Sequence, residues 1–181
     1  MKKLILKLSV LLFISGSKVD AATLQPEEVM ASFASSTGQW LQLPAVEANN
    51  CYDLDTDRRD DGAVFTVRID LDGDGMAEFF VRTLCGTGGC EYPLFAGITG
   101  RHLGNVFGSQ VWLLKRRTNG MPIIEAFSHS GAMGGSITRY EFDGAQYLAT
   151  TVRELSGEQA TEALYQILSK VPTWQSPETN R

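Results

Sequence analysis

The chain has 181 residues, with 16 lysines and arginines against 21 aspartates and glutamates, which gives a formal charge of −5 and a pI near 5.0. An acidic chain does not attract phosphate backbones, so the composition argues against general binding to nucleic acid. With 43% hydrophobic and 20% charged residues, the chain can bury a core, which excludes wholesale disorder.

The first 21 residues have the layout of a secretory signal peptide. Lys2 and Lys3 form a positive start, residues 4–14 are mostly apolar, and Val19 and Ala21 suit the positions before a cleavage site. The apolar run is too short to anchor the chain in a bilayer. We therefore expect a signal peptide over 1–21, a single β-rich domain over 22–175, a loose tail over 176–181, no membrane anchor after cleavage, and a periplasmic or secreted protein.

The three cysteines fit an oxidising compartment. Cys85 and Cys90 are separated by four residues, three of them glycines, so the segment can fold back and bring the two sulfurs together. We predict a Cys85–Cys90 disulfide. Cys51 is left either as a free buried thiol or as a replacement for one member of that pair.

The remaining pattern predicts a mainly β fold. Gln25 to Glu28, with Pro26 suited to a first helical position, predict a short N-terminal helix that ends at Thr37-Gly38. Residues 39–45 are expected to be extended. Alternating apolar residues bounded by Gly, Asn or Asp predict strands over 63–69, 78–84, 92–96, 110–115, 122–128, 136–142 and 146–152.

Two hairpin turns and a final helix complete this organisation. Asn119-Gly120 and Asp143-Gly144 tolerate positive φ, as tight hairpins require. A capping box at Ser156 and Gln159 predicts a C-terminal helix over 157–170. The short spacing between strands favours an antiparallel meander, like one propeller-blade sheet, over βαβ units.

The strongest motif is the acidic loop over residues 70–78. Carboxylates occupy its positions 1, 3, 5 and 9, and glycine occupies position 6, which permits a sharp turn. Ca²⁺ prefers six to eight oxygen ligands, which such a loop supplies from alternate side chains and a backbone carbonyl. An EF-hand would need a glutamate at position 12, where this chain has Val81. We predict a structural Ca²⁺ site formed by Asp70, Asp72, Asp74, the carbonyl of Met76, and Glu78. The alternative is a solvated hairpin turn without a metal.

This segment, Ile69-Asp70-Leu71-Asp72-Gly73-Asp74-Gly75 followed by Glu78-Phe79-Phe80-Val81, resembles the strand–calcium loop–strand unit of FG-GAP and VCBS-type repeats. The resemblance covers about 25 residues and implies Ca²⁺ binding by the loop carboxylates. A second acidic series has the same spacing but Arg58 at position 6, so we expect it to be a solvated loop; it comprises Asp53, Asp55, Asp57 and Asp61.

The sequence offers little for catalysis. Ser128-His129-Ser130 places a hydroxyl beside an imidazole, but neighbouring residues on a strand point to opposite faces. Gly-x-Ser-x-Gly is absent, and a thiol–imidazole pair of Cys51 with His129 or His102 is the remaining alternative. Zinc-ligand spacing is absent as well. We therefore predict no catalytic residues and a structural role for His129.

Two glycine-rich segments are the predicted binding loops, because mobile loops on a rigid sheet often carry recognition. The alternative is turn chemistry alone. The residues are Gly86, Thr87, Gly88 and Gly89 in the first loop and Gly131, Ala132, Met133, Gly134 and Gly135 in the second.

The order of the calcium-type hairpin, the two cysteines, an aromatic strand and Ser128-His129-Ser130-Gly131 resembles small secreted bacterial proteins. It also resembles the β-rich periplasmic immunity proteins that block type VI cell-wall amidases. The resulting hypothesis is a non-enzymatic periplasmic module that binds another protein, in its sharper form an inhibitor or immunity protein against a secreted cell-wall hydrolase. A periplasmic hydrolase acting on cell-wall or carbohydrate material is the alternative, and a structural envelope protein is a third.

Overall fold

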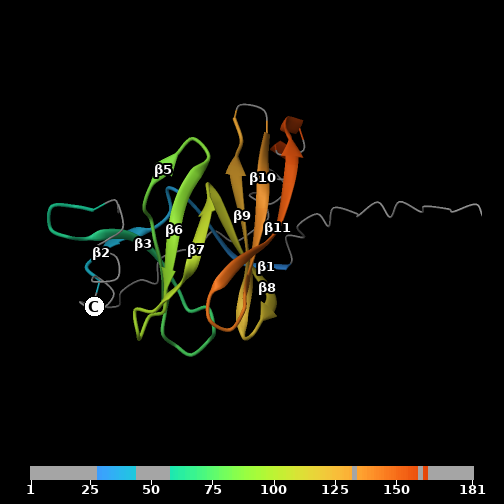
Figure 1. Cartoon of the computed structure of the whole chain (residues 1–181). Helices are drawn as coiled ribbons and strands as arrows, with labels where there is room; N and C mark the ends of the chain where they lie inside the picture. The colour runs from blue at the N-terminus through green and yellow to red at the C-terminus, as the bar shows by residue number, and fades with distance from the viewer. Residues whose placement is uncertain (1–27, 44–57, 132–133, 159–160, 163–181) are drawn as a thin grey trace, which may run out of the picture.

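The computed structural model describes residues 28–43, 58–131, 134–158 and 161–162. Their strands build two antiparallel sheets that form the two layers of the molecule (Figure 1). Sheet A has the order β1-β8-β9-β10-β11, and sheet B has the order β2-β3-β4-β6-β5, with β7 also paired to β6. The strands are β1 Val29–Ala34, β2 Gln39–Leu41, β3 Val64–Ile69, β4 Glu78–Val81, β5 Cys85–Gly86, β6 Gly89–Phe95, β7 His102–Gly108, β8 Gln110–Thr118, β9 Met121–His129, β10 Gly134–Phe142 and β11 Tyr147–Ser156.

The main core lies between the two sheets. Phe33, Leu113 and Ile124 of sheet A share one buried cluster with Phe80 and Leu94 of sheet B. Because side chains alternate along a strand, each sheet directs every second residue into this cluster. The fold is therefore a β-sandwich.

The predicted mainly β class is confirmed, and each of the seven predicted strand segments overlaps a strand of the structure. The expected single blade-like meander is replaced by two sheets. The chain starts in sheet A, crosses to sheet B for β2–β7, and then returns, so β8 to β11 form a four-stranded meander in sheet A and β2 to β4 a three-stranded one in sheet B. Both predicted hairpin turns are present, with positive φ at Asn119, Gly120 and Gly144.

The predicted N-terminal helix is wrong, because residues 29–34 form strand β1 beside β8. Val29 and Phe33 are four residues apart, a spacing that fits one face of a helix. In the structure a register shift between Val29 and Ala31 sends the two side chains into different clusters. Pairing with β8 thus overrides the local helical pattern.

Several predictions fall outside the described residues. These include the signal peptide, the tail, Cys51 and most of the predicted C-terminal helix. After β11, residues 157–158 and 161–162 have a helical backbone. In the described ranges, no helix has the length and apolar character needed to cross a membrane.

The loops gather at two opposite ends of the sandwich. One end, here called the aspartate end, holds the β3–β4 loop and the β8–β9 and β10–β11 turns. Arg117 joins two of them, because its Nη1 donates to the carbonyls of Leu71 at 2.8 Å and Gly120 at 2.6 Å. The other end, the disulfide end, holds the turn after β1, the β5–β6 loop and the β9–β10 connection (Figure 1).

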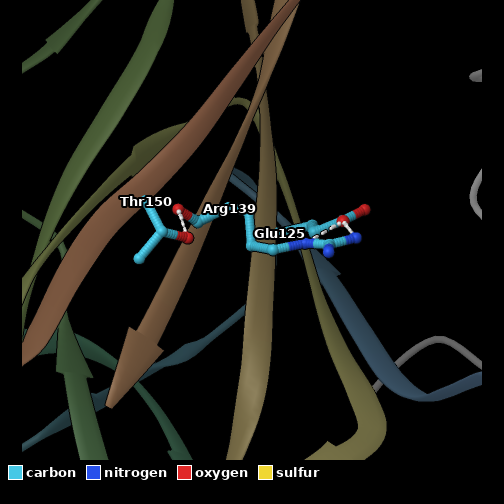
Figure 2. A network of polar contacts seen from close by, with 3 residues as sticks. All are labelled: Glu125, Arg139 and Thr150. Atoms are coloured by element: carbon cyan, nitrogen blue, oxygen red, sulfur yellow. Dashed lines mark hydrogen bonds and ion pairs between the residues drawn. The ribbon is translucent and has the colours of Figure 1, made fainter. Parts of the chain in front are cut away.

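The outer face of sheet A carries a second buried cluster that includes Trp112, Phe127 and Ile137. Glu125 and Arg139, directly opposite each other on β9 and β10, form an ion pair on this face. The guanidinium donates from both Nε, at 2.8 Å, and Nη2, at 2.5 Å, to one oxygen of Glu125 (Figure 2). The side chain of Glu125 is 6% exposed, so this ion pair offsets the cost of removing the carboxylate from water.

Candidate functional site

The acidic loop connects β3 to β4 at the aspartate end. Gly73 and Gly75 have φ of 86° and 88°, which glycine adopts readily, and these two residues let the chain turn back on itself. Asp70 accepts hydrogen bonds from both glycine amides, from Gly73 at 2.7 Å and from Gly75 at 3.0 Å. Asp72 and Asp74 each accept a hydrogen bond from the amide two residues ahead. The loop is thus closed by its own carboxylates.

Three of the predicted ligand residues come together. Carboxylate oxygens of Asp70, Asp72 and Glu78 all lie within 4.8 Å of one another, so this trio can hold a metal ion. Asp74 caps the amide of Met76 and is not part of the trio, and the Met76 side chain is exposed. An oxygen-only set on a tight loop suits a hard cation such as Ca²⁺.

Glu78 is the unusual member, because it is buried while the aspartates lie near solvent. Burial raises the pKa of Glu78 to about 7. A hydrogen bond of 2.8 Å from the Leu71 amide lowers this pKa, and the charges of Asp72 and Asp74 raise it further. A buried carboxylate beside two like charges is stabilised in its ionised form by a cation.

The second acidic series lies largely outside the described residues. Of its predicted members, Asp61 is described, and it accepts a hydrogen bond from the Ala63 amide and lies 4.0 Å from exposed Arg59. These contacts agree with a solvated turn at that residue.

At the disulfide end the Cys85–Cys90 bond is present, as predicted. The two residues face each other directly across the β5–β6 pair, so the bond closes a tight hairpin. Cys90 is buried in the main core, whereas Cys85 is exposed. The disulfide therefore attaches the exposed Gly86–Thr87 segment to the core.

The double variant Cys85→Ala/Cys90→Ala is expected to lose about 2 kcal/mol of unfolding free energy, because without the disulfide the unfolded chain is no longer restricted by a short closed loop. Urea unfolding of variant and wild type measures this loss. Intact mass and thiol alkylation of the wild type should show one bond and one remaining thiol. Equal stability of the two proteins would contradict a structural role for the bond.

The structure joins the first predicted glycine loop to the end of β9, the strand that leads into the second loop. The His129 amide, at the end of β9, donates to the Gly88 carbonyl at 3.0 Å. The Ser130 amide donates to the Gly134 carbonyl, also at 3.0 Å, and closes the second loop. Ala132 and Met133 lie outside the described residues. The first loop is thus attached to the strand end from which the second loop begins.

The glycines of these loops have different physical roles. A Cβ on Gly89 would lie 2.3 Å from the Gly108 backbone, and one on Gly135 would lie 2.4 Å from the Phe127 ring, so both residues are needed for packing. A Cβ on Gly88 or Gly134 would meet a backbone carbonyl at 3.1 Å. Gly86 has open space where a side chain would lie and no positive φ, so a substitution there tests the surface without disturbing the packing or the backbone.

A groove of about 490 Å³ lies beside the first loop. It is lined by the disulfide loop, by Ser35 and Ser36 of the turn after β1, by Ser109, and by Arg82 just beyond β4. No sequence motif pointed to Arg82 or to these serines, because only the pairing of distant strands brings them together.

The histidines do not assemble a catalytic group in the described part of the chain. The exposed His129 ring packs edge-on against Phe127, with centroids 4.8 Å apart. The adjacent Ser128 hydroxyl instead lies 3.0 Å from the Ser136 hydroxyl. His102 hydrogen-bonds to Asn105 at 2.7 Å on the surface. Within the described ranges, neither imidazole hydrogen-bonds to a serine or a cysteine.

Comparisons of the chain with protein-family models, with curated proteins and with solved structures found no match. The likeness to a calcium-loop unit therefore rests on the residues of the 70–78 loop, and the candidate sites lie at the two ends of the sandwich.

Proposed function

We propose that this protein is a non-enzymatic, extracytoplasmic binding module that captures another protein with its disulfide end and is stabilised by Ca²⁺ at its aspartate end. In the sharper form of this proposal, it inhibits, or gives immunity against, a secreted cell-wall-degrading enzyme. The observation that carries the proposal is the hydrogen bond from the His129 amide to the Gly88 carbonyl, which joins the first glycine loop to the end of the strand that leads into the second.

Rigid support favours recognition at these loops. The first loop is held by the disulfide and by the His129–Gly88 hydrogen bond, while Gly86 and Thr87 remain exposed between these attachments. A surface that is already ordered loses less conformational entropy when it binds than a flexible loop does. Loops on a rigid β scaffold are common recognition surfaces for this reason.

The cation has a scaffold role in this proposal. Asp70, Asp72 and Glu78 lie at the opposite end of the strands from the glycine loops, so a bound ion does not touch the partner. It neutralises the carboxylates and fixes the β3–β4 connection. Calcium removal is expected to change stability more than affinity.

The alternative of a hydrolase has no supporting contact among the described residues. It would need His129 to act as a base, yet its ring packs on Phe127 and its neighbour Ser128 is hydrogen-bonded to another serine. His129→Ala is the discriminating variant, because an enzyme would lose activity and a binding module would retain its partner.

Gly86→Arg is expected to abolish partner capture while the fold survives. The new side chain enters open space, so it blocks the surface without a clash. The matched control is Ile98→Arg, which places the same group on a 65% exposed position at the aspartate end. The measurement is a pull-down from periplasmic extract, with circular dichroism to confirm folding.

Capture lost in Gly86→Arg and kept in Ile98→Arg would support the proposal. A folded Gly86→Arg variant that retains every wild-type partner would argue against a binding site at the disulfide end. Loss in both variants would point to a nonspecific charge effect rather than to this surface.

A further inference from the structure

We propose that the Cys85–Cys90 disulfide is a site of thiol–disulfide exchange, at which a low-molecular-weight thiol attacks the sulfur of Cys85 and forms a reversible mixed disulfide. The exchange itself depends only on the exposure of the bond. The adduct then blocks partner capture, and this second step rests on the proposed function. The bond is thus both a structural crosslink and a switch for the surface beside it.

The two cysteines differ in their access to solvent. Cys85 lies in the short strand β5, whose two residues are both exposed. Cys90 is only 4% exposed and belongs to the main core. A thiolate has to reach the sulfur that it attacks, and exposed disulfides exchange more readily than buried ones. Cys85 is therefore the attacked sulfur, and Cys90 is the leaving group.

The exchange balances without any further reagent. The attacking thiolate forms a new S–S bond to the Cys85 sulfur, the Cys85–Cys90 bond breaks, and its electron pair leaves with the Cys90 sulfur. The Cys90 thiolate takes up a proton, which replaces the proton that the attacking thiol lost when it ionised. The attacking thiol is oxidised and Cys90 is reduced, so no additional oxidant or reductant is required.

The hairpin that carries the bond makes the exchange reversible. Backbone pairing joins β5 to β6 at Cys85 and Cys90 independently of the sulfurs. The Glu91 amide also donates to the Leu84 carbonyl at 3.0 Å, at the base of the same hairpin. These contacts hold the Cys90 thiol beside the adduct on Cys85. Cys90 can therefore displace the bound thiol and restore the original disulfide.

The groove beside the bond gives the thiol a place to bind. Its volume of about 490 Å³ lies in the range of small-molecule sites, and both cysteines line it. Ser36 and Thr87 contribute hydroxyl groups to its walls, which suit a polar thiol of tripeptide size. Gly86 and Gly89 also line it and place no side chain over the disulfide. An adduct on Cys85 would cover the exposed Gly86–Thr87 segment, where the partner is proposed to bind.

The first test needs no partner protein, so its failure leaves the proposed function untouched. The full chain, with its disulfide formed, is incubated with millimolar reduced glutathione at about pH 8, where part of the thiol is ionised. Samples are quenched with acid at early times and mapped by peptide mass spectrometry. The mixed disulfide on Cys85 should exceed that on Cys90 at least about tenfold, because access decides which sulfur is attacked.

Unfolding provides the control for this selectivity. In urea both sulfurs are accessible, so the ratio of the two adducts should fall close to one. An intact bond after incubation of the folded protein, equal labelling of the two cysteines, or labelling mainly at Cys90 would overturn the proposal. A ratio that is unchanged in urea would equally contradict it, because burial would then not set the selectivity.

Ser36→Tyr tests whether the thiol enters through the groove. The substitution places a bulky side chain at an exposed position of the groove wall and leaves both cysteines in place. Exchange should slow at least about fivefold. Ile98→Tyr, which adds the same group at the aspartate end, should react like wild type. A folded Ser36→Tyr protein that exchanges at the wild-type rate would rule out the groove as the route of attack.

Cys51→Ser removes the remaining thiol and should exchange like wild type. Markedly slower exchange in this variant would show that the reaction runs through Cys51, and it would reject direct attack on Cys85. The same background gives a stable adduct, since Cys51→Ser/Cys90→Ala leaves Cys85 as its only cysteine. Oxidised glutathione then labels Cys85, and no second cysteine can displace the label.

The regulatory step is tested by the pull-down, with labelled and unlabelled samples of that double variant. Labelling should reduce capture at least about tenfold, because the adduct clashes with a partner seated on this surface. Circular dichroism confirms that both samples are folded. Unchanged capture, together with loss of capture in Gly86→Arg, would keep the binding surface and reject its control by the adduct. Unchanged capture in both would reject the binding surface itself, and the exchange measured by mass would still stand.

Discussion

Arg139→Met is expected to lower the unfolding free energy by about 3–5 kcal/mol, among the largest effects of any single substitution in this protein. The change leaves the carboxylate of Glu125 buried without its cation. That carboxylate accepts hydrogen bonds from both Nε and Nη2 of the arginine (Figure 2). The Glu125 side chain is only 6% exposed. An unpaired buried charge must either be hydrated or take up a proton, and both reduce stability.

The double variant Glu125→Leu/Arg139→Met provides the control. It removes both charges next to Trp112 and Ile137, which already make this face apolar, and stability is expected to return close to the wild-type value. Urea unfolding of the wild type, both single variants and the double variant forms a complete cycle. If the double variant were as unstable as Arg139→Met, the loss would come from packing and not from charge.

Strands could be predicted here because their signal is local. Residues 63–69 show the two-residue alternation of a strand, and Val67 and Ile69 lie in the main core. Asn119-Gly120 marks a turn that strands of this twist require. Strand β7 contains Gly104 and Gly108, which weaken its apolar pattern, so this strand is not among the predicted ones. Gly104 is needed because a Cβ there would lie 2.6 Å from the Tyr147 carbonyl of β11.

The split into two sheets could not be predicted, because it depends on which strands pair. Strand β1 could not be predicted for the same reason. The spacing of Val29 and Phe33 fits a helix and a strand equally well, and only the pairing with β8 and its register shift make the segment a strand. Pairing between distant segments is a property of the whole chain, and a local window does not contain it.

The candidate sites also differ in whether their residues are contiguous in the sequence or are brought together by strand pairing. The acidic loop is contiguous, so its spacing alone points to Asp70, Asp72 and Glu78, and the structure places them together. The glycine loops are each visible in the sequence, but the hydrogen bond that joins the first of them to the end of β9 is not. The groove at the disulfide end becomes a candidate only when the structure places Arg82 against the turn at Ser35, beside the first loop.

Glu78→Gln is expected to have opposite effects with and without calcium. In chelator, the wild type holds a buried carboxyl whose pKa is about 7 in the folded protein, against an ordinary value of 4.5 in the unfolded chain. The folded protein therefore binds the Glu78 proton more tightly than the unfolded chain does, which adds to the free energy of unfolding. This contribution is fully present below pH 4.5 and is lost as the pH rises through 7. The loss amounts to roughly 3 kcal/mol. The amide of the substituted glutamine cannot ionise, so the variant should keep its stability across this range and exceed the wild type at about pH 8.

With millimolar calcium the order should reverse. Ca²⁺ bound by the ionised trio stabilises only the folded wild type, so its melting temperature should rise at about pH 8 and rise much less at about pH 5, where protons compete for Glu78. Glu78→Gln and Asp72→Ala should show little response to calcium. Ile98→Arg, at the same end but outside the trio, should respond like wild type. Melting curves across pH in calcium and in chelator measure all of this. Identical wild-type curves in the two conditions at the higher pH would exclude a calcium site here, whereas a calcium response that persists in Glu78→Gln would place the ion elsewhere in the chain.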